Sequence, residues 1–243
     1  MQRLRVSDNR RYLVREDGSP FLWIGDTAWH MVDTPTREEV DLYLDHRAAN
    51  GFSVIQTAIF MGKGDDAAQR RNPANAYGHR PFQGGDEPDP ASPRVLPGGT
   101  PDAPADYWDH LDYIVRAARL RGLYLALLPC WGAYHIGGRF GPAGVIFDAH
   151  TAHAYGAFVG ARYGQEPHVI WVLGGDTGAD EPSDKRRIYR QMAQGLVEGA
   201  TGSSPLWDEA HNAWDQLLMT YHPHAVQSSS FWFDRDVWLD LNT

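Results

Sequence analysis

The sequence predicts an α/β protein of the (β/α)8 TIM-barrel type, in which parallel strands alternate with helices. Short apolar runs alternate with longer segments of helical periodicity along the 243 residues. The runs are apolar throughout rather than at every second residue, which is typical of strands that are covered on both faces of a parallel sheet. Each run ends in a polar loop marked by glycine or tryptophan, and the carboxyl ends of barrel strands are where such folds place their chemistry.

The five apolar runs give the expected strands. We expect them at residues 21–25, 52–58, 123–129, within 168–177, and at 217–221. The tail at residues 238–241 is expected to begin a sixth strand. A barrel needs eight, so the sequence predicts an incomplete barrel in a single partial domain that spans residues 1–243.

Helix starts between these runs are marked by residues that cap helices. Thr36 and Glu39 have the spacing of a capping box, Asp106 and Asp148 precede further helical segments, and Ser183 is expected to start the last. The ends are expected at Asn50 and Gly51, at Gly122, at about Tyr163 and near Gly199.

A long irregular loop, at about residues 60–105, follows the second strand. It holds half of the 16 prolines. A connection of this length inside a compact domain is usually functional or disordered.

A doubly wound sheet is the main alternative fold. It would normally have a glycine-rich phosphate loop after its first strand. Here Gly25 is followed by Asp26, Thr27, Ala28 and Trp29, which offer bulk and negative charge where a phosphate needs bare N–H groups. The barrel is therefore favoured.

Composition excludes several classes of function. The net charge of −9 argues against a nucleic-acid partner. No run of about 20 apolar residues is present, so no membrane span or membrane partner is expected. The N-terminus lacks the apolar core of a signal peptide, which predicts a cytoplasmic location if the sequence is complete and otherwise leaves the location open. The single cysteine, Cys130, excludes an intrachain disulfide and a thiolate-rich metal site.

The tripeptide Gly-Asp-Thr occurs at the ends of two predicted strands, at residues 25–27 and 175–177. The glycines bare the backbone where the strand emerges, so that a ligand can approach. The pair predicts a pocket lined by Asp26 and Asp176. The nine tryptophans and eleven tyrosines suit the faces of sugar rings as well as a protein core.

These motifs resemble the apiosidase-like glycoside hydrolases (family 140), and they occur in family order over almost the whole chain. The segments that carry the resemblance are Phe21-Leu22-Trp23-Ile24-Gly25-Asp26-Thr27-Ala28-Trp29, Thr36-Arg37-Glu38-Glu39, Gly51-Phe52-Ser53-Val54-Ile55-Gln56, Asn75-Ala76-Tyr77-Gly78 with Pro81-Phe82, Leu127-Leu128-Pro129-Cys130-Trp131-Gly132, Trp171-Val172-Leu173-Gly174-Gly175-Asp176 and Leu218-Met219-Thr220-Tyr221-His222-Pro223. The resemblance implies a TIM-barrel enzyme that acts on plant pectic side chains through two carboxylates, with Asp176 as the general acid/base. It implies a carbohydrate substrate, no cofactor and no metal.

The chemistry of glycosidases supports this role for Asp176. Retaining glycosidases use one carboxyl group to protonate the leaving oxygen and a second, about 5 Å away, to attack the anomeric carbon. The acid needs apolar surroundings or a neighbouring negative charge. Val172, Leu173 and Trp131 are expected to supply the first and Asp26 the second. The alternative is that Asp176 only caps its loop.

Seven further residues are predicted to bind substrate. They are Asp26, Trp29, Gln56, Trp131, Tyr221, His222 and Trp232. Asp26 is expected to hold sugar hydroxyls, the tryptophans to stack on rings, and Tyr221 with His222 to form a pair at the end of the fifth strand. Gln56 is predicted equally well to face the pocket or a helix.

The second carboxylate is the departure from the family pattern. The resemblance places the nucleophilic glutamate on a later strand, beyond Thr243. Glu209 precedes the fifth strand and is expected at the opposite end of the barrel. We therefore expect weak or no turnover by this chain alone. Exposed strand edges of a partial barrel would favour a homo-oligomer.

Two other functions remain open at this stage. A carbohydrate-binding barrel without catalysis would keep the aromatic residues and Asp26. A metal-dependent hydrolase is suggested by two histidine pairs, His222 with His224 and His150 with His153. Surface and capping roles explain these pairs better, because in metal barrels the paired histidines typically end an early strand.

Overall fold

A five-stranded parallel sheet forms the centre of the molecule. The computed structural model describes residues 1–64, 66–100, 102–138 and 141–243. The strands, in the order in which they pair, are β10 (Met219–His222), β9 (Val169–Gly174), β8 (Tyr124–Leu128), β5 (Val54–Ala58) and β4 (Gly25–Thr27). All four pairings are parallel. The predicted α/β class with a parallel sheet is confirmed, and five strands in one curved sheet fit an incomplete barrel.

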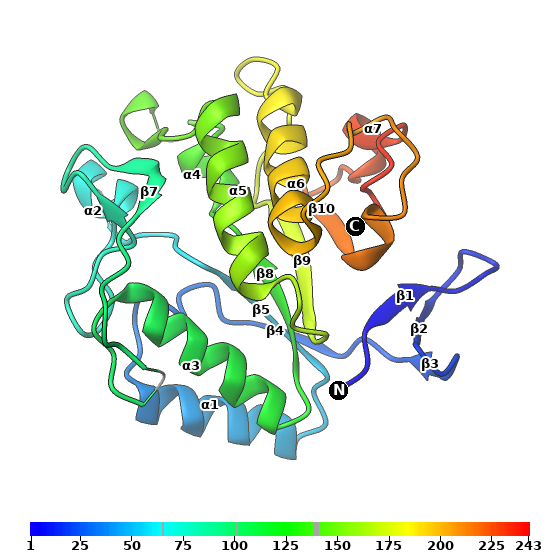
Figure 1. Ribbon diagram of the computed structural model, residues 1–243, viewed down its shortest axis with the longest axis horizontal. Helices are drawn as coiled ribbons and strands as arrows, with labels where there is room; N and C mark the ends of the chain where they lie inside the picture. The colour runs from blue at the N-terminus through cyan, green and yellow to red at the C-terminus, as the bar shows by residue number, and fades with distance from the viewer. Residues whose placement is uncertain (65, 101, 139–140) are drawn as a thin grey trace.

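Four long helices cover the outer face of this sheet (Figure 1). They are α1 (Arg37–Ala49), α3 (Tyr107–Leu120), α5 (Ala149–Tyr163) and α6 (Arg186–Thr201). Thr36, Asp106 and Asp148 each accept a backbone N–H of the first turn, as their sequence positions predict.

The expected start of the last helix at Ser183 is wrong. The helix α6 begins at Arg186, because the Asp184 carboxylate accepts the backbone N–H of Arg186 at 3.0 Å. The helix also continues past Gly199 to Thr201, and Gly202 with φ +75° ends it. Gly199 lies inside the helix, at a position where a Cβ would collide with the carbonyl of Ala157 on α5. Glycine at this position therefore serves close packing of α5 and α6 rather than helix termination.

Alternate residues along each strand pack into two different hydrophobic cores. Ile55, Leu125 and Trp171 belong to the core between the sheet and the helices. Val54, Ala126 and Val172 belong to the core inside the curve of the sheet, together with residues of the N-terminal strands. This alternation decides which side chains reach the interior of the barrel and which reach the helices.

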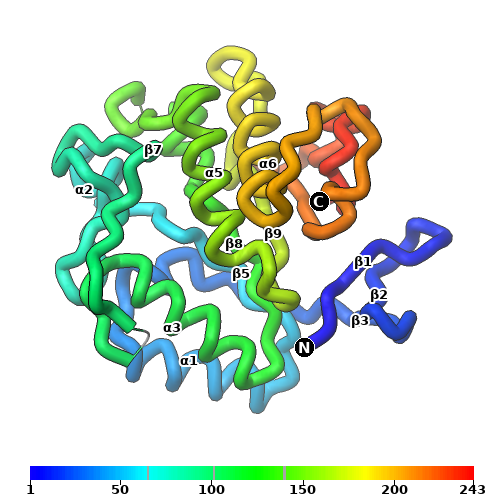
Figure 2. Tube along the Cα trace, in the orientation of Figure 1, coloured from blue at the N-terminus to red at the C-terminus, as the bar shows by residue number. Residues whose placement is uncertain are grey.

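The predicted first strand at residues 21–25 is wrong, because these residues include the end of one strand and the start of another. Phe21 ends β3 (Pro20–Phe21), which forms a small antiparallel sheet with β1 (Leu4–Val6) and β2 (Leu13–Arg15). The barrel strand begins only at Gly25. Between them Leu22 is 72% exposed, so an apolar run here marks a connector and not a buried strand. In the tube trace, the small sheet stands beside the barrel (Figure 2).

The long loop at about residues 60–105 is folded over the described part of its length. It contains α2 (Ala67–Arg71) and the paired strands β6 (Phe82–Gln83) and β7 (Asp89–Pro93). Asn72 is fully buried and bonds both the N–H and the carbonyl of Phe82. The remaining short helices are α4 (Gly132–His135), η1 (Pro142–Gly144), η2 (Trp214–Gln216) and α7 (Ser230–Phe233).

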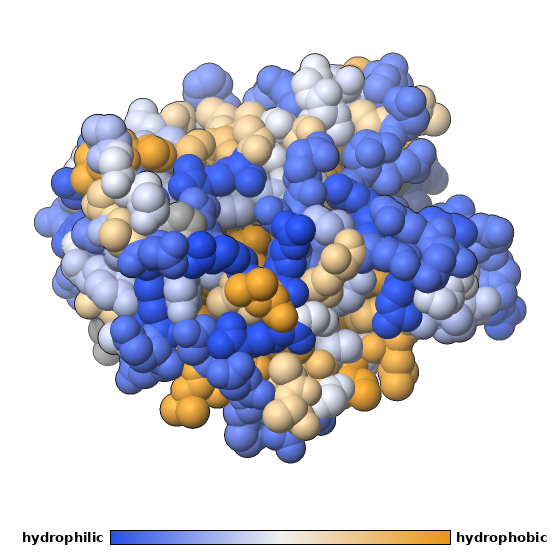
Figure 3. Space-filling view, turned by 60° about the horizontal axis from the view of Figure 1, so that its bottom comes forward, coloured by the Kyte–Doolittle hydropathy of each residue, from blue (hydrophilic) through white to orange (hydrophobic). Residues whose placement is uncertain are grey.

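The edges of the sheet are β4 and β10. At the tail, Leu241 forms a single parallel bridge with Thr220 on β10, where the sequence predicts a sixth strand to begin. The face turned forward in Figure 3 is mostly hydrophilic, with separate apolar patches. Among the described residues no helix is long and apolar enough to cross a bilayer.

Candidate active site

Asp176 lies directly beyond the carboxyl end of β9, at the rim of the barrel. The strand ends at Gly174, and three consecutive residues have positive φ: Gly174 at 91°, Gly175 at 120° and Asp176 at 49°. A non-glycine residue rarely adopts this left-handed conformation, and where it does the site is often functional. The turn leaves the Asp176 side chain 53% exposed at the rim.

The two glycines are required by the contacts of this turn. A Cβ on Gly175 would lie 3.0 Å from the indole of Trp131, and a Cβ on Gly174 would lie 2.9 Å from the ring of Tyr221. The backbone is tied on both sides, because Gly175 N–H donates to His222 at 2.9 Å and the Gly175 carbonyl accepts from Ala133 at 2.9 Å. The loops after β8, β9 and β10 therefore hold Asp176 jointly.

The His222 ring lies beside the Asp176 carboxylate, and two tryptophans pack against that ring. Nε2 of His222 lies 3.7 Å from Oδ1 of Asp176. The His222 ring stacks on Trp29 with centroids 5.6 Å apart, and Trp131 contacts both rings, at 4.9 Å from Trp29 and 5.9 Å from His222. We refer to Trp29, Trp131, Asp176 and His222 as the rim cluster.

The electrostatics of the rim cluster favour a neutral imidazole. Burial lowers the pKa of His222 below its ordinary value, and the Asp176 carboxylate opposes this shift without cancelling it. At neutral pH the ring therefore adds no positive charge beside Asp176, yet it can still donate one N–H.

Tyr221 points away from the rim cluster, to the helix side of the sheet. It is fully buried, and its hydroxyl donates to the carbonyl of Thr177 at 2.7 Å. Burial raises the pKa of Tyr221, so the hydroxyl stays a donor. Trp232, on α7, packs edge-on against Tyr221 at 5.8 Å and is also buried. The structure places both side chains beneath the loop that carries Asp176, and their predicted contact with substrate stays a prediction.

Asp26 is not brought to the rim cluster. It is the register partner of Ile55, which faces the helices, so Asp26 also turns outward. There it accepts hydrogen bonds from Arg47 and, at 2.9 Å, from Tyr43 on α1. Burial alone would raise the pKa of Asp26, but the bonds from Arg47 and Tyr43 outweigh it and lower the pKa. Its charge is paired with Arg47, so the expected pocket lined by both aspartates, with Asp26 as the negative charge beside Asp176, is wrong. Its predicted role in holding sugar hydroxyls stays a prediction.

Gln56 faces the interior of the barrel. It lies between Val54 and Ala58 on β5, both of which belong to the inner core, and it is half-buried. Its register partners are Thr27 on β4 and Ala126 on β8. Of the two orientations that the sequence allows, the structure has the one directed into the barrel.

Two cavities open beside the rim cluster. One of about 380 Å³ is almost wholly apolar and lies between Trp29 and α1, where Met31, Val40 and Tyr43 line it. The other, of about 330 Å³, lies beside Thr177 and is lined by Gly137, Gly138, Thr177, Glu181 and Pro182. The sequence did not single out Thr177 and Glu181 as functional residues. Only their position in the loop after Asp176 could have indicated them.

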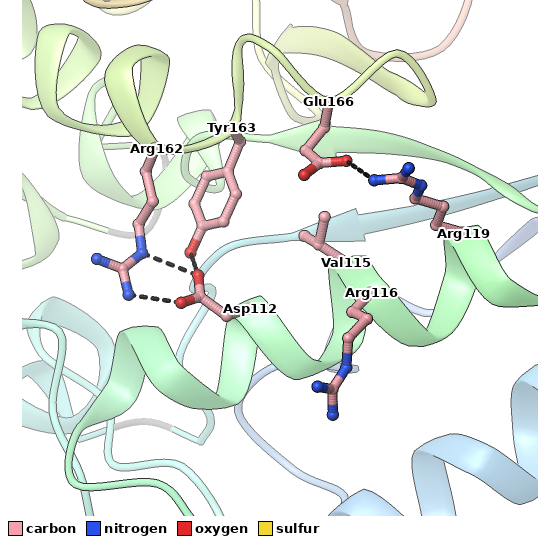
Figure 4. A pocket seen from close by; sticks show the side chains of 7 residues that line it. All are labelled: Asp112, Val115, Arg116, Arg119, Arg162, Tyr163 and Glu166. Carbon is pink, nitrogen blue, oxygen red and sulfur yellow. Dashed lines mark hydrogen bonds and ion pairs between the residues drawn. The ribbon is translucent and has the colours of Figure 1, made fainter. Parts of the chain in front are cut away.

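A larger cavity, of about 490 Å³, lies away from the rim between α3 and α5 (Figure 4). Ion pairs line this cavity. Arg162 donates to Asp112 through two nitrogens, at 2.8 and 2.6 Å, and Arg119 lies 3.5 Å from Glu166. Paired charges of this kind hold two helices together, so size alone does not mark the site.

The histidine pairs do not converge on a metal position. Among the described residues, no three His, Cys, Asp or Glu side chains are grouped so that they could hold a metal ion. The histidines turn to separate carboxylates: His224 lies 3.7 Å from Glu181, and His153 lies 3.2 Å from Glu198 on α6.

Comparisons with known proteins concern the chain as a whole rather than the rim cluster. The family model described as the apiosidase-like catalytic domain matches residues 7–243. A glycoside hydrolase family 5 protein from Bacteroides vulgatus ATCC 8482 superimposes with a TM-score of 0.78 at 30% identity, over 99% of this chain and 44% of that one. A second structure, described as a glycoside hydrolase, gives a TM-score of 0.75 at 29% identity, over 99% and 45%.

More distant structures share the fold alone. The endo-1,4-β-mannanase from Rhizomucor miehei has a TM-score of 0.52 at 12% identity, over 90% of this chain and 60% of that one. No curated protein matches the chain. The chain spans less than half the length of the first two solved structures that it resembles.

Proposed function

The chain belongs to the apiosidase-like catalytic domain family, and from this premise we propose that it is a glycosidase domain in which Asp176 is the general acid/base. The proposed substrate is an apiose-containing side chain of a pectic polysaccharide. The resemblance of the chain to the family, and the family's name, support apiose as the sugar. The rim cluster supports general acid catalysis by Asp176.

The observation that carries the proposal is the position of Asp176 just beyond β9 and beside His222, whose ring packs against Trp29 and Trp131. A carboxyl group at the carboxyl end of a barrel strand, beside flat aromatic faces, suits a sugar ring and the oxygen that leaves it. Its backbone is held by three loops, so the carboxyl group needs little reorganisation when a substrate binds.

In the proposed mechanism the protonated Asp176 donates its proton to the glycosidic oxygen as the bond breaks. The resulting carboxylate then accepts a proton from the attacking water in the second half of the reaction. His222, which is neutral, can donate an N–H to the Asp176 carboxylate in that second state. Its Nε2 lies 3.7 Å from Oδ1, so a small movement would complete this bond.

A second carboxylate is needed, and we propose that it does not come from residues 1–243. Glu209 lies in the segment before β10, and its carboxylate accepts the N–H of Leu206 at 3.3 Å. This position corresponds to the amino ends of the strands, opposite to Asp176. The solved relatives are more than twice as long as the matched region, which leaves room for a nucleophile elsewhere in such proteins.

Sugar binding by the 243-residue chain tests the proposal. We expect methyl β-D-apiofuranoside to bind, without turnover, and the substitution Trp29→Ala to weaken binding about tenfold through loss of an aromatic platform. Trp207→Ala is the matched control, since Trp207 contacts Arg190 and not the rim cluster. Protein-observed NMR titration measures both affinities and verifies the fold.

Two results would count against the proposal. If the folded chain shows no shift with the apioside, the sugar assignment fails. If Trp29→Ala binds as well as Trp207→Ala, the rim cluster is not the binding site. Binding that is retained with no turnover in any longer form of the protein would favour a carbohydrate-binding barrel without catalysis.

A further inference from the structure

The cavity of about 330 Å³ is lined by Thr177, the residue that follows the proposed general acid, and not by the aromatic rings of the rim cluster. Gly137 and Gly138 form one wall, from the segment after α4, and Thr177, Glu181 and Pro182 form the other. Thr177 follows Asp176 directly in the chain. A volume of this size is at the lower end of the range for sites that enclose small ligands.

Hydrogen bonds and close contacts fix the loop segment that carries Glu181. The Thr177 carbonyl accepts from Tyr221, and the Ala179 carbonyl accepts the N–H of Lys185 at 2.6 Å. A Cβ on Gly178 would lie 3.0 Å from the indole of Trp232 and 3.3 Å from Cδ of Glu181, so the loop is folded closely over that indole. The position of Glu181 relative to Asp176 is therefore set by buried contacts.

Glu181 presents a carboxylate that is open to a ligand. Its Oε1 lies 3.7 Å from Nε2 of His224, and its side chain is 54% exposed. A carboxylate has about four acceptor positions, and one distant histidine occupies at most one of them. Adjacent hydroxyl groups of a sugar ring are donors of the right kind, and hydrogen bonds to a charged acceptor are the stronger ones.

A general acid of a glycosidase stands between two sugar rings, because it protonates the oxygen that joins them. One ring is accounted for by the aromatic side of the rim cluster. The ring on the other side of that oxygen needs a cavity with a hydrogen-bond acceptor in its wall, and the cavity lined by Thr177, Glu181 and Pro182, in the loop that continues from Asp176, has one in Glu181.

We propose that this cavity is the subsite for the leaving-group sugar, and that Glu181 accepts hydrogen bonds from hydroxyl groups of that sugar. The inference rests on the proposed glycosidase function and deepens it by assigning a residue to the second sugar. Glu181 binds and orients this ring, and it takes no part in the proton transfer.

Two ligands that differ only in the leaving group test this assignment. One is methyl β-D-apiofuranoside, which has no second ring, and the other is a disaccharide in which the same apiosyl group is linked to galactose. We expect Glu181→Gln to weaken binding of the disaccharide about tenfold and to leave the affinity for the methyl glycoside unchanged, because one charge-assisted hydrogen bond is lost. Protein-observed NMR titrations of the 243-residue chain measure the affinities.

Glu198→Gln is the matched control, since Glu198 also lies near a histidine, 3.2 Å from His153, but on α6 away from the rim. If Glu181→Gln changes neither affinity, or weakens both ligands equally, the subsite assignment is overturned while the sugar-binding function stands. If the folded wild-type chain binds neither ligand, the proposed function fails and the subsite fails with it.

Discussion

The tripeptide Gly-Asp-Thr occurs twice in one sheet, at β4 and after β9, with two strands between them, and its two aspartates have opposite environments. Asp26 lies within β4, in extended backbone, and its carboxylate is paired with Arg47 and Tyr43 on α1. Asp176 lies two residues beyond the end of β9, in left-handed backbone, and its carboxylate lies at the rim beside His222.

The difference between them comes from position relative to the strand end. A residue inside a strand points to the side that the pleat dictates, and for Asp26 that side carries the helices. A residue beyond the strand is released from the pleat, and glycines at positive φ can turn it into the rim. The same tripeptide therefore contributes a structural ion pair through Asp26 and a candidate general acid through Asp176.

The largest expected effect concerns turnover, and it separates the two aspartates. In a form of the protein that contains the second carboxylate, Asp176→Asn is expected to lower kcat/KM for an apiosyl disaccharide about a thousandfold, in the middle of the range for a lost general acid. Asp26→Asn is expected to keep most of the activity. Steady-state kinetics of the two variants decide this, and the opposite ranking would reverse the assignment.

A smaller effect is expected from Tyr221, which holds the carbonyl of Thr177. Tyr221→Phe removes that hydrogen bond and is expected to lower kcat about tenfold with little change in KM, because the acid is less well placed while the sugar platforms remain. Tyr107→Phe removes a comparable buried bond, to the carbonyl of Ile59 at 2.6 Å, which directly follows β5 and does not belong to the loop that carries Asp176.

Both tyrosine variants should lose about 1 kcal/mol of stability, since each loses one buried hydrogen bond. Only Tyr221→Phe should lose kcat. An equal kcat in the two variants would show that Tyr221 has a structural role alone.

Asp26 should also contribute to stability through its ion pair with Arg47. Asp26→Asn is expected to lower the free energy of unfolding by about 1 kcal/mol at pH 7, after allowance for the partial exposure of the pair. The pKa of Asp26 is lowered in the folded state, so this contribution is present above the ordinary carboxyl pKa and disappears as the pH falls through the lowered value.

Urea unfolding of wild type and Asp26→Asn at pH 7 and at about pH 2.5 measures this difference. The gap between the two proteins should narrow at the lower pH. A gap that is the same at both pH values would contradict the ion-pair role of Asp26.

The smallest expected effect is on the free energy of unfolding, and it tests the backbone conformations of the two aspartates directly. Asp176→Gly should have a free energy of unfolding about 1 kcal/mol higher than that of Asp176→Ala, because both variants lose the carboxylate and only glycine adopts the φ of +49° without steric cost. Asp26→Gly should lower the free energy of unfolding relative to wild type, since glycine within a strand is unfavourable and the ion pair is lost. Chemical unfolding of these variants gives the comparison, and equal stability of Asp176→Gly and Asp176→Ala would show that the turn is not left-handed.

Much of the fold follows from short-range patterns. Thr36, Asp106 and Asp148 are recognisable caps because a capping bond joins residues only two or three positions apart. The strands of the parallel sheet were indicated by runs that are apolar at every position. The same rule fails at residues 21–25, where an apolar connector between two sheets has the composition of a buried strand.

The candidate site could be predicted only in part, because its geometry depends on register. The sequence indicates that Asp176 follows a buried strand, which is where the structure has it. It cannot indicate that Asp26 is paired with Ile55 and so faces α1, or that Tyr221 and His222, adjacent in the chain, face opposite sides of β10. These facts depend on which residues of neighbouring strands lie opposite one another, and no local pattern contains them.

The dependence of the reaction on the leaving group tests the role of Asp176 most directly. A general acid matters when the leaving oxygen needs a proton and matters little when it does not. For Asp176→Ala we predict a loss of about a thousandfold with an apiosyl disaccharide, and a far smaller loss in the bond-breaking step with a 2,4-dinitrophenyl apioside, in a form of the protein that contains both carboxylates. Equal losses with the two substrates, or full activity with both, would contradict the assignment of Asp176 as the acid.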